Sequence, residues 1–114
     1  EYLFAAEHIV GVHPKVKAVS IYPSDNLYDK ENEIREVLID IQDGSEIVIV
    51  TDMHGSTPAN LALKASKGFG CKVLFGANLP LIVKLIKVRA LSANDAVELA
   101  VNAGKKYINW MSPT

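Results

Sequence analysis

The first half of the chain places apolar side chains at spacings that predict helices around one short strand. Residues 1–11 repeat apolar positions three and four residues apart, which predicts an amphipathic helix that Gly11 ends. The run KAVSIY (17–22) predicts a strand, which the turn residues after it close. Helical spacing returns from about Asp29 to Gln42, with acidic residues in the first turns, where the helix dipole favours them.

The second half alternates strands and helices. EIVIVT (46–51) and CKVLFG (71–76) are apolar on both faces, as expected for parallel strands covered by helices on each side. The segment YINW (107–110) closes the chain as a tail or an edge strand. The helices predicted in this half run over 58–67, from 80 to about 88, and from Ser92 or Asn94 onward.

Short connections between alternating strands and helices are typical of βαβ units. We therefore predict an α/β fold with an open, mostly parallel sheet and helices on both faces, in three layers (α/β/α). A chain of 114 residues, 49% of them hydrophobic, fits a single domain over residues 1–114. Ligands of such sheets bind beyond the carboxyl ends of the strands. Residues 52–57 and 76–78 both follow predicted strand ends, so they are the candidate site.

Composition argues against several classes of partner. With 12 basic and 13 acidic residues, the chain has no strong field to attract nucleic acid or an anionic membrane surface. No run approaches the ~20 apolar residues of a membrane span. We expect neither nucleic-acid binding nor membrane insertion. The spaced lysines are interpreted as solvated helix faces: Lys64, Lys67, Lys72, Lys84 and Lys87.

The lone cysteine and the three histidines suggest no metal or redox site. Cys71 is the only cysteine, which rules out an intrachain disulfide and favours a reducing, cytoplasmic setting. It leads an apolar run with no activating base nearby, so we interpret it as a small buried hydrophobe. No pair among His8, His13 and His54 has metal-ligand spacing, and we expect no metal and no cofactor.

Candidate chemistry concentrates in the turn TDMHGSTP (51–58). Thr57 before Pro58 predicts a helix start at which the hydroxyl caps free N–H groups. Gly55 and Ser56 let the backbone approach a ligand and aim N–H groups at it, which makes an anion cradle for a phosphoryl group or a carboxylate. The turn lacks the lysine and the glycines of a Walker loop. The same pattern also occurs without function in α/β proteins, so a purely structural interpretation stays open.

Two side chains beside the cradle have several interpretations. Asp52, at the end of a buried strand, either caps the turn, orients a catalytic histidine or acts as a nucleophile. We interpret His54, two residues after Asp52, as a pocket wall rather than a phosphoryl acceptor.

Three stretches, VIVTDMHGSTPANLA, GANLPLIVKLIKVR and AVNAGKKYIN, together resemble the IIA component of the mannose family of the bacterial phosphoenolpyruvate-dependent sugar phosphotransferase system, especially its stand-alone regulatory versions. In that family a strand ends in T-D-aromatic-G-G-[ST]-P-x-N, and a later strand runs into G-x-N-L-P. The resemblance implies a parallel α/β fold that forms a homodimer. It also implies a phosphoryl carrier, which accepts from a histidine-phosphorylated carrier protein and passes the group to a downstream IIB component or a regulatory protein.

Position by position, the resemblance implies roles for particular residues. Asp52 corresponds to the acid that orients the active histidine, and Gly55, Ser56 and Thr57 correspond to the phosphate-cradling turn. His54 stands where the family has an aromatic or apolar residue, and Ser56 replaces the second glycine, so both crowd the cradle. The neighbouring active-site loop corresponds to Asn78, Leu79 and Pro80.

The family's phosphoacceptor histidine lies in a T-H-G turn after a first strand, and this sequence contains neither that strand nor that turn. Glu1 aligns inside the family's first helix. Without a central strand, its neighbours would leave backbone N–H and C=O groups unpaired. We therefore expect the native protein to carry that strand and this chain to be N-terminally incomplete.

Two further functions stay open. The first is a regulatory module of the same fold that binds another protein and transfers nothing. The second is a receiver-like or haloacid-dehalogenase-like domain with Asp52 as the acyl-phosphate acceptor, on fold analogy alone. The dehalogenase pattern needs an acid where His54 stands, and the acid pair and lysine of a receiver are not located.

Overall fold

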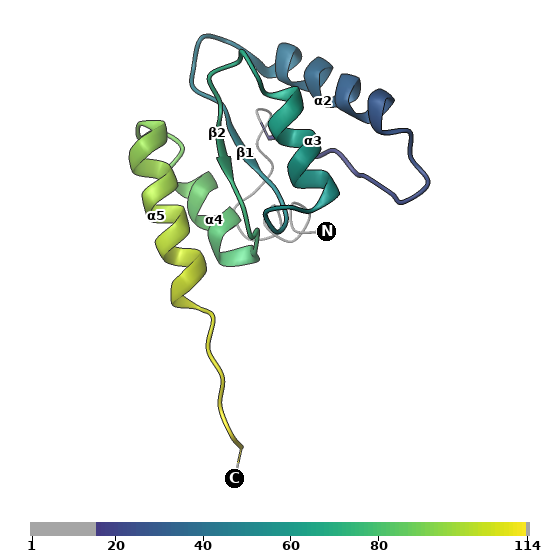
Figure 1. Cartoon of the computed structure of the whole chain (residues 1–114). Coiled ribbons are helices and arrows are strands. Elements are labelled where there is room, and N and C mark those ends of the chain that lie inside the picture. The colour runs from purple at the N-terminus through teal and green to yellow at the C-terminus, as the bar shows by residue number, and fades with distance from the viewer. Residues whose placement is uncertain (1–15, 114) are drawn as a thin grey trace.

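The computed structural model describes residues 16–113, and in this part of the chain it shows four helices and two short strands (Figure 1). From α2 onward their order matches the alternation predicted from the sequence. The helix predicted over residues 1–11 lies outside the described residues. The elements are α2 (Leu27–Ile41), β1 (Val48–Val50), α3 (Thr57–Ala65), β2 (Lys72–Leu74), α4 (Leu79–Lys87) and α5 (Ala93–Lys106).

Each of these helices begins at a polar side chain that accepts a hydrogen bond from a backbone N–H in the first turn, which satisfies a donor that the helix itself cannot. The cap expected at Thr57 is wrong. Ser56 is the N-cap of α3, because its Oγ accepts from the N–H of Ala59 at 3.3 Å, and Thr57 is already helical. The capping residues of the four helices are Asn26, Ser56, Asn78 and Ser92.

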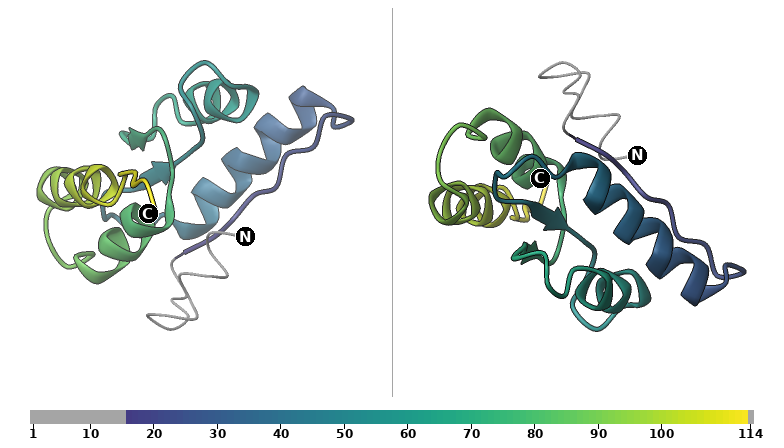
Figure 2. Two further views of the ribbon diagram at one scale, coloured as in Figure 1. Left: turned by 90° about the horizontal axis from the view of Figure 1, so that it is seen from below. Right: turned by 90° about the horizontal axis from the view of Figure 1, so that it is seen from above.

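The two strands form a parallel pair, with Ile49 opposite Val73. Helices α2 and α3 pack together on one side of this pair, and α4 packs along α5 on the other (Figures 1 and 2). The arrangement has three layers, which confirms the predicted α/β fold with helices on both faces of a parallel sheet. Among the described residues, the sheet contains only these two strands.

The segment predicted as an early strand, residues 17–22, is extended but does not belong to the sheet. It leads into α2 through a turn in which the N–H of Asp25 donates to the Tyr22 carbonyl at 3.0 Å (Figure 2). The strand prediction is wrong for the described chain, because a strand needs a neighbour to complete its ladder. A cavity of about 1060 Å³ lies between this segment and β1, where a paired strand would otherwise be expected.

The core lies where β2 meets α4 and α5. Leu74, Leu81 and Ala100 are buried there, and half-buried aliphatic side chains surround them. Small residues on α5 let the helices approach closely. A methyl group added at Gly104 would lie 3.2 Å from both Leu81 Cβ and Asn78 Oδ1. The first turn of α4 therefore packs on α5 with little room for a side chain.

We expect Gly104→Leu to lower the free energy of unfolding by about 1–3 kcal/mol, because the added side chain overpacks the contact between α4 and α5. Urea denaturation measures this change. Asn102→Leu on the exposed side of the same helix is the control and should leave stability nearly unchanged. Equal stability of the two variants would contradict the close helix contact.

Candidate functional site

The loops that follow β1 and β2 are joined by backbone hydrogen bonds beyond the strands. The N–H of Thr51 donates to the Leu74 carbonyl at 2.9 Å. In return, the N–H of Ala77 donates to Thr51 O at 3.1 Å and the N–H of Gly76 donates to Asp52 O at 3.2 Å. The two segments that the sequence placed after strand ends therefore lie at the same edge of the sheet.

The turn after β1 has the geometry of a partial anion cradle. The N–H of Ser56 donates to the Met53 carbonyl at 3.0 Å, so it serves the turn itself. Gly55 has φ 93°, a left-handed conformation that glycine adopts without strain. Within residues 16–113, the N–H groups of Gly55 and Thr57 have no hydrogen-bond partner. The cradle offers these two donors rather than one from each of the three predicted residues.

Asp52 takes part in the turn and also borders the large cavity. Its Oδ1 accepts from the N–H of Met53 at 2.8 Å, which agrees with the turn-closing interpretation of this acid. The other carboxylate oxygen has no partner among residues 16–113. Asp52 is exposed and also lines the cavity.

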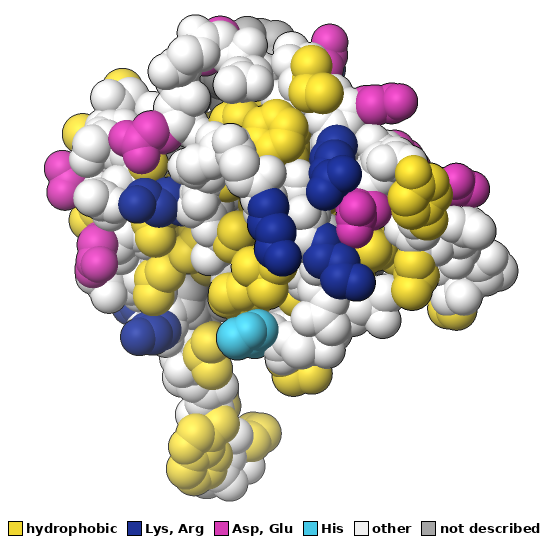
Figure 3. All heavy atoms as spheres, turned by 45° about the horizontal axis from the view of Figure 1, so that its top comes forward, with side chains coloured by type: hydrophobic (Ala, Val, Ile, Leu, Met, Phe, Trp, Pro, Cys, Tyr) yellow, Lys and Arg dark blue, Asp and Glu magenta, His cyan; other side chains and the backbone are white. Residues whose placement is uncertain are grey.

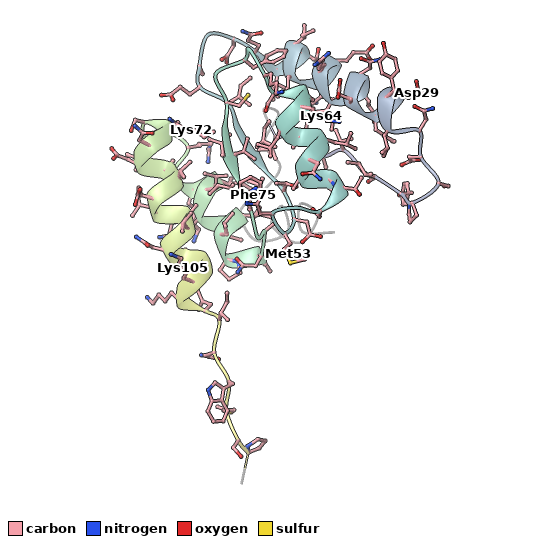
Figure 4. All side chains as sticks on the ribbon, viewed as in Figure 1. Asp29, Met53, Lys64, Lys72, Phe75 and Lys105 are labelled. Atoms are coloured by element: carbon pink, nitrogen blue, oxygen red, sulfur yellow. The ribbon has the colours of Figure 1, made fainter. Side chains whose placement is uncertain are left out.

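His54 stacks on an aromatic ring of the neighbouring strand end. The ring centroids of His54 and Phe75 are 4.3 Å apart, and the ring planes differ by 21°. Figure 4 shows Phe75 and Met53 at the same end of the sheet. The stack joins the cradle turn to the loop after β2, and such ring pairs contribute about 0.5–1.5 kcal/mol beyond area burial. Phe75 is a site residue that the sequence did not single out. Its only signal was its place directly before Gly76.

Asn78, Leu79 and Pro80, which the resemblance placed in an active-site loop, form the start of α4. Asn78 Oδ1 accepts from the N–H of Leu81 at 3.0 Å, and its Nδ2 donates to the Gly104 carbonyl at 3.1 Å. The amide therefore joins α4 to α5. Among the described residues it makes no hydrogen bond to the cradle.

Thr51 carries a buried hydroxyl without a partner. Its exposed fraction is 8%, and within the described part of the chain its Oγ1 makes no hydrogen bond. An unsatisfied buried hydroxyl costs about 1–3 kcal/mol. Thr51 lines the same cavity as Asp52. Thr51 opens the turn TDMHGSTP, but no role was assigned to it, because threonine is a common strand residue and its partners become countable only in the folded chain.

The edge of β1 that faces away from β2 carries backbone groups without a partner strand in the described part of the chain. In a parallel ladder, alternate residues direct both backbone groups to the same side. Ile47 and Thr51 bond to β2, so Val48 and Val50 direct their N–H and C=O groups to the opposite edge. Those residues and the extended segment Val16–Ile21 line the cavity. A strand edge and apolar side chains thus bound it, which suits an additional β-strand.

The remaining chemistry of the described residues is sparse. Partial burial raises the pKa of the Cys71 thiol, which disfavours the reactive thiolate. Within residues 16–113, no cluster of three or more His, Cys, Asp or Glu side chains is suited to a metal ion. No helix in that range is both long and apolar enough to cross a membrane. Lysine and arginine side chains gather on one face, with acidic side chains among and around them (Figure 3).

The fold and the site define an α/β protein whose candidate site lies at the carboxyl edge of two parallel strands. The chain belongs to the family described as the PTS system fructose IIA component, whose family model matches residues 1–102. This confirms the resemblance found in the sequence and disfavours the receiver-like alternative. The family is a component of a phosphotransferase system, so a role related to phosphoryl transfer follows.

Two solved structures share the fold. The phosphotransferase system component EIIA from Streptococcus agalactiae superposes with a TM-score of 0.83 at 24% identity, over 95% of this chain and 85% of that chain. A Klebsiella pneumoniae protein described as a phosphoenolpyruvate-dependent sugar phosphotransferase system permease gives 0.79 at 20% identity, over 96% and 80%. A search of curated proteins gave no match.

We expect Asn78→Ala to lower the free energy of unfolding by about 1–3 kcal/mol, because it removes the cap of α4 and the bond to Gly104. Chemical denaturation measures the loss. The control is Asn94→Ala, at an exposed position of α5, and should change stability little. If both variants unfolded alike, Asn78 would not join the two helices.

Proposed function

We propose that this protein is a phosphoryl carrier of the phosphotransferase system. It accepts a phosphoryl group from a histidine-phosphorylated carrier protein onto a histidine and passes it to a downstream IIB component or uses it as a regulatory signal, in the cytoplasm. One observation carries the proposal: the Asp52 carboxylate and the two unpaired N–H groups of Gly55 and Thr57 come from one turn, and Asp52 borders a cavity edged by β1. Family membership supports the chemistry.

The acceptor histidine, in this proposal, follows a strand that fills the cavity. A strand parallel to β1 would pair with the backbone groups of Val48 and Val50, and its side chains would pack on Val37 of α2 and Leu85 of α4, which line the cavity. Carboxyl ends of parallel strands meet at one edge, so the residue after this strand would emerge beside Asp52. The expectation of a first strand in the native protein thereby becomes part of the proposal.

The transfer then uses the groups at this edge. The carboxylate of Asp52 accepts a hydrogen bond from the N–H of the acceptor imidazole, which leaves the other ring nitrogen as the nucleophile. That nitrogen bonds to phosphorus while the N–P bond of the carrier breaks, and the electron pair returns to the carrier's imidazole. The N–H groups of Gly55 and Thr57 donate to the equatorial oxygens. His54 on Phe75 forms one wall of the pocket.

We expect Asp52→Asn to slow phosphoryl transfer from the phosphorylated carrier by about 10²-fold, because the amide neither selects the tautomer nor stabilises the charged imidazole. Single-turnover transfer to the protein as encoded measures this rate. Asp95→Asn, on the exposed first turn of α5, is the charge-matched control and should transfer at the wild-type rate.

Unchanged transfer by Asp52→Asn would remove the role assigned to this acid. The regulatory module would be favoured if the wild-type protein bound the phosphorylated carrier but gained no phosphoryl group from it. In that case the turn would recognise a phosphoryl group without accepting it.

We also propose that two copies of the chain form a homodimer through the tail that follows α5. This tail is extended and projects from the body with hydrophobic side chains on its surface (Figures 1 and 3). Trp110 and Met111 are 87% and 83% exposed, and neighbouring exposed apolar side chains of this kind are typical of interaction surfaces. The outer edge of β2, where Val73 directs its backbone groups away from β1, suits a strand from a second copy.

Removal of residues 107–114 should convert the dimer to a monomer, because it deletes the segment that pairs with the second copy. Sedimentation velocity at one concentration compares the two forms. Asn109→Ala, a small change within the tail, is the control and should stay dimeric. A monomeric intact chain, or a dimer that survives the deletion, would contradict this mode of association.

A further inference from the structure

We propose that the Thr51 hydroxyl is a positioning group for phosphoryl transfer. It hydrogen-bonds to the polypeptide turn that carries the acceptor histidine and sets the distance of the imidazole from Asp52. This inference rests on the proposed function and adds to it a residue that does not itself touch the phosphoryl group. The observation behind it is a buried hydroxyl that lines the cavity and lacks a partner.

Two hydrogen bonds to the segment at the end of β2 hold the backbone of Thr51 in place. Its N–H donates to the Leu74 carbonyl at 2.9 Å, and its own carbonyl accepts from the N–H of Ala77 at 3.1 Å. Both backbone groups are therefore used, and rotation of the backbone cannot relieve the side chain. A β-branched residue also has few favourable χ1 rotamers. The hydroxyl must find its partner where it stands.

The cavity is the open space beside Thr51 from which a partner can reach the hydroxyl. Thr51 is the one buried polar side chain in the described part of the chain, and β1 before it is wholly aliphatic. Valine has nearly the same shape as threonine and would fit such surroundings without an unpaired hydroxyl. Buried polar side chains are as a rule hydrogen-bonded. Thr51 lines the cavity beside Asp52, so the group that occupies this end of the cavity is in reach of both.

The chemistry of the partner follows from its place. A hydroxyl donates one hydrogen bond and accepts others, so it can bond a backbone carbonyl or N–H group. A strand that runs parallel to β1 ends beside Thr51 and Asp52, where its next residues form the acceptor turn. The hydroxyl thus binds the backbone of that turn, while Asp52 binds the imidazole.

Thr51→Val and Thr51→Ser in the protein as encoded test this role. Valine keeps the shape and removes the hydroxyl, and serine keeps the hydroxyl. In single-turnover transfer from the phosphorylated carrier, we expect Thr51→Val to be about tenfold slower at saturating carrier, the effect of one lost hydrogen bond. The carrier concentration at half-maximal rate should stay unchanged, and Thr51→Ser should transfer within about twofold of the wild type.

Ser66→Ala, which removes a hydroxyl at the far end of α3, is the control and should not affect transfer. If Thr51→Val fails to fold, Thr51→Ala and Thr51→Ser make the same comparison. Wild-type transfer by the hydroxyl-free variants would overturn this inference alone and leave the carrier function standing. Absence of transfer by the wild-type protein would overturn both.

Discussion

The parallel pairing of β1 with β2 is the interaction on which the candidate site depends. Its hydrogen bonds continue past the strands, through Thr51 and Asp52 on one side and Gly76 and Ala77 on the other. They place the cradle turn and the start of α4 at one edge of the sheet. The stack of His54 on the aromatic ring that ends the second strand adds a side-chain contact between the same two segments.

Unpaired polar groups line the edge of β1 that faces away from β2. Backbone groups of Val48 and Val50, the Thr51 hydroxyl and one oxygen of Asp52 all have no partner among residues 16–113. Unpaired backbone groups and a buried hydroxyl are costly, and here they border one cavity whose lining is mostly apolar. A single extended segment that places a histidine at its carboxyl end would satisfy them together. This agreement links the open edge of β1 to the proposed phosphoryl transfer.

Local patterns in the sequence predicted the helices, the two strands and the edge at which the site lies, because helical period, capping residues and apolar runs act over a few residues. Ser56 rather than Thr57 caps α3, since two hydroxyls compete there and only folded geometry selects one. Residues 17–22 have the composition of a strand but pair with no neighbour among residues 16–113. The stacking of His54 and the burial of Thr51 depend on contacts between distant segments, which no local pattern contains.

We propose that a β-strand occupies the cavity beside β1. Residue-resolved amide hydrogen exchange of the protein as encoded tests it without any partner protein. If a strand pairs there, the amides of Val48 and Val50 will exchange as slowly as those of Ile49 and Thr51, because both edges of β1 are then hydrogen-bonded. Rapid exchange at Val48 and Val50 beside slow exchange at Ile49 and Thr51 would show an open edge and contradict the account.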